Sequence, residues 1–126
     1  MKKPVVCSIV VLALTQGAAL AHRVTVHINN ALSSCVSIHI KNTKVQDNMV
    51  LANTTFQLHQ PIAECGCRSA LVGYNSVTSV NTVVQVMQSG LIGVKRSGNQ
   101  TLVLASEQAL IGDGELQLQL QCAPAL

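Results

Sequence analysis

Apolar and polar residues alternate over much of the chain beyond residue 22. One residue in two is apolar in Arg23–Ile28 and in Val36–Ile40, and Leu116–Gln121 repeats Leu-Gln three times. A period of two places the apolar side chains on one face of a β-strand and the polar side chains on the other. Antiparallel sheets with one face in water have this pattern, whereas buried parallel sheets do not. The alternation therefore predicts an antiparallel β protein.

Short polar turns separate the alternating segments. Residues 29–34 form a loop between the first two segments, which we therefore expect to pair as a hairpin. Asp47-Asn48 is a second turn signal. Pro61 ends the strand before it or places that strand at an edge. The β-branched residues of 77–87 disfavour a helix there, because they lose side-chain freedom in a helix.

The spacing of these segments predicts about seven to nine short strands in one domain. One short stretch, Ser106–Leu110, has the pattern of a single helical turn with Ser106 as its cap. Many short strands separated by polar turns are typical of a sandwich or a barrel. We therefore expect an all-β fold, an antiparallel β-sandwich or barrel-like domain.

The amino-terminal residues have a different pattern. Two lysines near the start precede an apolar run over Val5–Leu14, and Ala19–Ala21 has the small residues of a cleavage site. This order predicts a secretory signal peptide over residues 1–21, cleaved to leave an all-β domain of residues 22–126. The apolar run is too short to span a bilayer stably. We expect a periplasmic or secreted protein without a stable membrane anchor after cleavage.

Cysteine count and spacing predict a disulfide framework. The predicted mature domain retains Cys35, Cys65, Cys67 and Cys122, and an even count in a small exported domain indicates two disulfides. A Cys65–Cys67 bridge is disfavoured because one intervening residue holds the two Cα atoms near the upper distance limit. Cys35 and Cys122 then pair with the two central cysteines in either order. A redox dithiol or a thiolate metal site at Cys65 and Cys67 is the less favoured alternative.

Composition and charge exclude several classes of partner. Phe56 and Tyr74 are the only aromatic residues, so the core must be aliphatic, and a base-stacking or aromatic binding surface is not expected. Without Lys2 and Lys3, the chain has six basic and five acidic residues. It contains no run of basic residues that could follow a phosphate backbone. Nucleic acid is therefore not an expected partner.

The histidines give an alternative to a metal-free protein. Cleavage after Ala21 would make His22 the terminal residue, whose amino and ring nitrogens can bind one copper ion. His27 and His39 lie on the polar faces of the two segments expected to pair, where cross-strand neighbours are close enough to share copper or zinc. The plainer interpretation is three exposed surface histidines, because no acidic residue lies nearby in the sequence to orient the rings. We expect no cofactor.

No motif organises the Ser, His and Asp residues for nucleophilic catalysis, so we do not expect an enzyme. The sequence favours an exported binding or accessory protein, such as an inhibitor, an immunity protein or a subunit-like component, whose partner is another exported protein. The expected contact patch is Glu64, Arg68 and Tyr74, beside the central cysteines. Tyr74 can equally be a core residue with its hydroxyl at the rim.

Overall fold

Seven β-strands and two short 3-10 helices make up the regular structure of residues 24–111 and 114–124, which the computed structural model describes. The elements are β1 Thr25–Asn30, β2 Val36–Gln46, β3 Met49–Leu58, η1 Ile62–Cys65, β4 Leu71–Val80, β5 Val83–Gly93, β6 Gly98–Ala105, η2 Gln108–Leu110 and β7 Glu115–Cys122. The predicted signal peptide, residues 1–21, lies outside the described residues.

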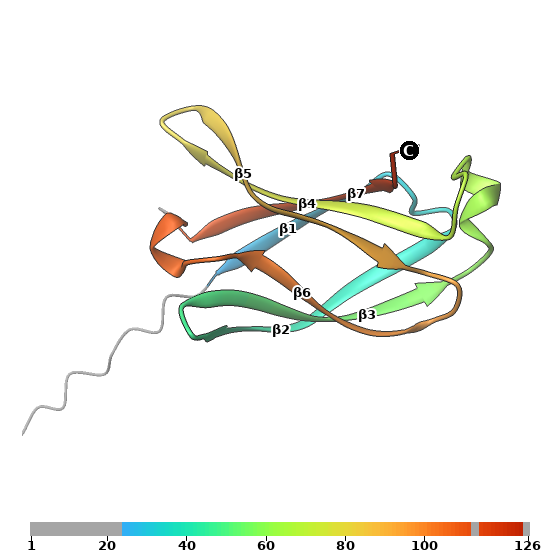
Figure 1. Ribbon diagram of the computed structural model, residues 1–126, viewed down its shortest axis with the longest axis horizontal. Coiled ribbons are helices and arrows are strands. Elements are labelled where there is room, and N and C mark those ends of the chain that lie inside the picture. Colours follow the sequence, from blue (N-terminus) through green and yellow to red (C-terminus); the bar gives the residue numbers. More distant parts are fainter. Residues whose placement is uncertain (1–23, 112–113, 125–126) are drawn as a thin grey trace, which may run out of the picture.

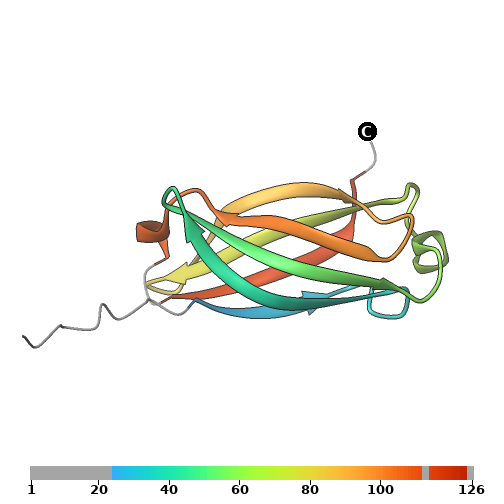
Figure 2. The same ribbon diagram turned by 90° about the horizontal axis from the view of Figure 1, so that it is seen from below.

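The strands form two sheets that stack face to face (Figures 1 and 2). One sheet has four strands in the order β1-β7-β4-β5, and the other has three in the order β2-β3-β6. The prediction of an all-β, disulfide-linked sandwich is confirmed. One pairing differs from the expected antiparallel pattern, because β1 runs parallel to β7.

The expected hairpin between the first two alternating segments is wrong. β1 pairs with β7, and β2 pairs with β3 in the other sheet. The intervening loop crosses between the sheets, and the Asn30 side chain shapes this crossing. Its Oδ1 accepts a hydrogen bond from the Leu32 N–H at 2.9 Å, and its Nδ2 donates to the Val36 carbonyl at 2.8 Å. Alternation decides which face of a strand is buried, but it does not select the partner strand.

The most regular segment of the sequence becomes an interior strand. β7 lies between β1 and β4, and Leu116, Leu118 and Leu120 on it are at most 1% exposed. The opposite sheet contributes Phe56 and Leu104, also buried, so the core is aliphatic apart from two aromatic rings.

Tyr74 is the second of those rings, and it joins the two sheets. Its side chain is 7% exposed, and its hydroxyl donates a hydrogen bond to the Val103 carbonyl on β6 at 3.1 Å. Gly90 lies opposite on β5, where a Cβ would approach the tyrosine ring to 2.5 Å. The absence of a side chain at Gly90 therefore makes room for the ring. The expectation of a partly exposed aromatic is wrong, and the core alternative describes Tyr74.

Two-residue turns close both long hairpins. The predicted turn at Asp47 and Asn48 is confirmed, with φ values of 51° and 68°. A second turn at Asn81 and Thr82, with φ values of 50° and 68°, divides the β-branched segment between β4 and β5. Positive φ at both central residues is the geometry of a type I′ turn, which suits the twist of the flanking strands.

The helical turn expected near residue 108 is present as η2, but its predicted cap is wrong. The residue before the helix is Glu107, in an extended conformation, and no side chain caps the helix.

Two disulfides connect the start and the end of the fold to its middle. Cys35 pairs with Cys65, and Cys67 pairs with Cys122. The structure thus decides the pairing order that the sequence left open. Gly66 separates the two central cysteines with φ of 90°, a left-handed conformation that glycine adopts without a steric cost.

Candidate functional site

Strand β5 presents exposed apolar side chains at the edge of the four-stranded sheet. Val83, Val84, Val86 and Leu91 are 58%, 66%, 59% and 60% exposed. The hairpin of β4 and β5 projects beyond the body of the sandwich (Figure 1), so both faces of its tip meet solvent. Successive residues of a strand point to opposite sides, so Val83 on one side and Val84 and Val86 on the other are all exposed.

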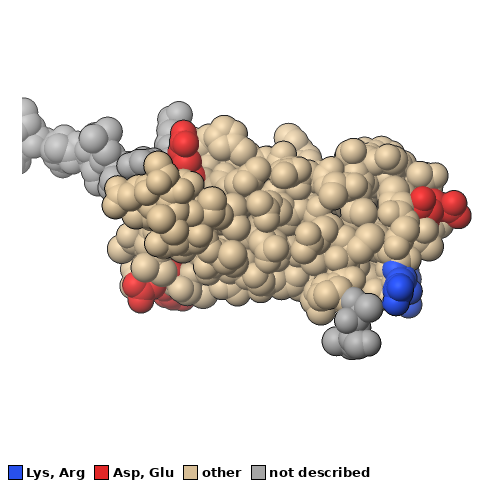
Figure 3. Space-filling model, turned by 90° about the horizontal axis from the view of Figure 1, so that it is seen from above, with Lys and Arg blue, Asp and Glu red and all other residues tan. Residues whose placement is uncertain are grey.

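The face beside this edge is polar but almost without charge. On β7, Gln117, Gln119 and Gln121 alternate with the buried leucines, and on the neighbouring strand Asn75 accepts a hydrogen bond from the Ser89 hydroxyl at 2.6 Å. No Lys, Arg, Asp or Glu occurs between Leu71 and Gly93. Figure 3 shows charged side chains only near the two ends of this side of the molecule. We call the exposed apolar residues of β5 and this uncharged face the β5 surface.

The other three edge strands differ from β5. β2 carries Lys41 and Lys44, both exposed. β1 is six residues long, and its exposed apolar residue, Ile28, is 40% exposed. β6 exposes Gly98 and polar residues, whereas Leu102 on it is 4% exposed. Lysine and short length are common ways to prevent an edge from pairing with another chain. Among the edges of the described fold, β5 alone combines length, exposed valines and an absence of charge.

A model of the family described as "Uncharacterized protein conserved in bacteria (DUF2195)" matches residues 9–125. The chain belongs to this family. No curated protein and no solved structure matches it.

In this DUF2195 family member, only two of the three residues predicted for partner binding are at the surface. Glu64 lies exposed in η1, and Arg68 lies exposed at the rim of a cavity of about 320 Å³ that Lys95 also lines. Tyr74 is buried in the core, away from solvent. The β5 valines were not predicted as a site, although their β-branched composition identified this segment as non-helical.

The geometry assumed for a shared metal site is also wrong. His27 lies opposite Gln117 in the four-stranded sheet, and His39 lies opposite Thr55 in the three-stranded sheet. The two histidines are therefore not cross-strand neighbours. His22 lies outside the described residues. Within 24–111 and 114–124, no group of three or more His, Cys, Asp or Glu residues is arranged to hold a metal ion.

One histidine is instead hydrogen-bonded to a serine on the exposed face of the three-stranded sheet. The Ser37 Oγ and the His59 Nε2 are 2.6 Å apart, joined by a hydrogen bond. Ser37 lies within β2, and His59 follows the end of β3, so the pairing of these strands brings the two side chains together. In the part of the chain that the structure describes, no acidic side chain is hydrogen-bonded to this pair.

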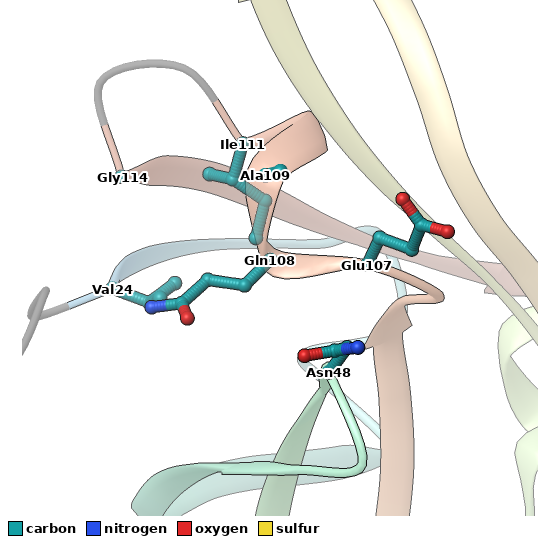
Figure 4. A pocket seen from close by; sticks show the side chains of 7 residues that line it. All are labelled: Val24, Asn48, Glu107, Gln108, Ala109, Ile111 and Gly114. Atoms are coloured by element: carbon teal, nitrogen blue, oxygen red, sulfur yellow. The ribbon is translucent and has the colours of Figure 1, made fainter.

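A cavity of about 490 Å³ opens at the end of the molecule where β1 begins. Val24 and Ile111 supply apolar walls, and Asn48 and Gln108 supply amides. Figure 4 shows the Gln108 amide reaching toward Val24, whereas the Glu107 carboxylate points the other way. The lining is thus mixed and nearly neutral.

No helix of the described residues is long and apolar enough to cross a membrane.

Proposed function

We propose that this DUF2195 protein is an exported binding protein without chemistry of its own, and that the β5 surface is its interface. The observation that supports this proposal is the row of exposed valines on an uncharged edge strand. Interface cores are depleted of charged residues relative to the rest of a protein surface. An edge strand also offers unpaired backbone groups that an extended partner can use for hydrogen bonds.

The energetics favour covering this edge. Burying the remaining exposed part of each β5 valine stabilises a complex by roughly 1 kcal/mol, because apolar surface is removed from water. The neutral side chains nearby carry no full charge that would have to be desolvated. A rigid, disulfide-linked sandwich also loses little conformational entropy when it binds.

Export is supported by the disulfides and by the predicted signal peptide. Two intramolecular bridges fit a protein of an oxidising compartment. The pattern over residues 1–21 is that of a cleaved leader. Within this proposal, the protein acts in the periplasm or outside the cell as an accessory subunit, an inhibitor or an immunity protein.

Site-specific photo-crosslinking in intact bacteria tests the proposed interface. A photo-reactive residue is placed at Val84 or Val86, and Val45, which is 46% exposed on β2, is the matched control. We expect crosslinked adducts from the two β5 positions and none from Val45. Equal yields at all three positions, or adducts at Val45 alone, would contradict the proposal. The intact mass from the same preparation tests export, because a cleaved chain has the mass of residues 22–126 with two disulfides.

A further inference from the structure

We propose that a second copy of this chain occupies the β5 edge, with the two β5 strands paired antiparallel about a two-fold axis. This inference rests on the proposed function and names its partner. Pairing would join the two four-stranded sheets into one continuous sheet across the axis, with β5 of each copy at the centre.

The β5 edge is unprotected in a fold that limits exposed apolar surface at its other edges. β2 is as long as β5, but Lys41 and Lys44 interrupt it. β5 contains no charge and no proline, and it exposes valine at 83, 84 and 86. Such an edge is a template for a further strand.

The exposed first half of β5 is also compatible with its own copy. A two-fold axis places a surface against itself, so any charge on it would meet the same charge on the partner. Like charges directly opposite each other destabilise a pair of strands. Val83–Gln88 contains valine, glutamine and methionine only, so the self-paired strands place apolar and amide groups together without repulsion.

The geometry of β5 limits how far the pairing extends. A register shift between β4 and β5 leaves Met87 as an extra residue, and such a bulge bends the strand. β5 also contacts β6 of the opposite sheet. The projecting tip, Val83–Val86, lies before the bulge and is the part that we expect to pair. A two-fold contact pairs the β5 edge of each copy with the β5 edge of the other. No β5 edge then remains open, so association stops at the dimer.

A second copy also fits better than an unrelated strand. An unrelated partner would have to supply an extended, uncharged segment that matches this edge. A second copy carries that edge by construction and is present in the same compartment at the same concentration.

The test compares Val84→Lys and Val86→Lys with Val45→Lys, using the mature protein with its disulfides intact. Sedimentation equilibrium gives the dimer dissociation constant. We expect the unmodified protein and Val45→Lys to dimerise alike, and each β5 variant to dissociate at least about tenfold more readily. A dimer that persists unchanged in both β5 variants would overturn the inference.

Amide hydrogen exchange of the unmodified protein gives a second readout that needs no variant. The amides of Val83–Val86 should become more protected as protein concentration rises, whereas those of Thr43–Gln46 on β2 should not change. A protein that stays monomeric, with β5 exchange independent of concentration, would overturn self-pairing. In that case, crosslinks from Val86 to a different protein would still support the proposed function, and their absence would overturn both.

Discussion

Tyr74 connects the two sheets, and its environment can be followed by a single absorbance measurement. It is the only tyrosine in the chain, it is buried, and its hydroxyl reaches from one sheet to a carbonyl of the other. Burial raises the pKa of its phenol above the ordinary value of 10.0, because the charged phenolate would lose its hydration. A single absorbance titration therefore reports on this one side chain.

We predict that the tyrosinate absorbance of the folded protein titrates at higher pH than that of the urea-unfolded protein. The folded state favours the neutral phenol, so its stability is complete below pH 10.0 and falls as the pH rises through the folded pKa. Tyr74→Phe should remove this alkaline loss and lower the unfolding free energy at neutral pH by about 1 kcal/mol, the value of one hydrogen bond. Identical titrations in both states would place the phenol in solvent.

At the scale of elements, the two hairpin turns share a geometry but differ in how well their residues suit it. Both positions of each turn have positive φ. Asparagine tolerates the left-handed region, whereas a β-branched residue does so only with strain. Thr82, with φ of 68°, is therefore the least suitable turn residue in the described fold.

We predict that Thr82→Gly raises the unfolding free energy by about 1 kcal/mol, because it creates an Asn-Gly turn without the steric cost of a Cβ. Asn48→Gly, at the equivalent position of the other hairpin, should give a smaller gain and is the matched control. Urea unfolding at one fixed protein concentration measures both, because the proposed dimerisation would make stability depend on concentration. A larger gain from Asn48→Gly than from Thr82→Gly would contradict this account.

For the whole molecule, the two disulfides constrain the chain over most of its described length. Cys35–Cys65 closes a separation of 30 residues, and Cys67–Cys122 closes one of 55. Both bridges reach the same short segment, because Cys65 is the last residue of η1 and Cys67 follows it by two residues. The start of β2 and the end of β7 are thus held near the middle of the chain even in the unfolded state.

We predict that replacing both cysteines of the longer bridge by alanine lowers the unfolding free energy by about 4 kcal/mol, and replacing both of the shorter by about 3.5 kcal/mol. The reason is the loop-closure entropy that each bridge removes from the unfolded chain. Urea unfolding of the two double variants and the unmodified protein checks the order. A much greater loss from removing the shorter bridge would show that native packing around Cys35, and not loop entropy, dominates.

The sequence by itself determined the all-β class, several of the strands and turns, and the set of paired cysteines. These properties are local or covalent: a period of two specifies a strand with one buried face, and an even number of thiols in an oxidising compartment specifies bridges. Leu116–Gln121 was therefore identified as a strand with its leucines inside, and the structure places it so.

Only the tertiary structure decided which strands pair, how the bridges connect and which edge stays open. Alternating strands have nearly interchangeable faces, so β1 lies beside β7, and not β2, through contacts between residues far apart in the chain. The same pairing separates His27 from His39, moves Tyr74 into the core and leaves β5 uncovered. A candidate site made from an edge depends on the absence of a neighbouring strand. The sheet order, a property of the whole fold, determines that absence.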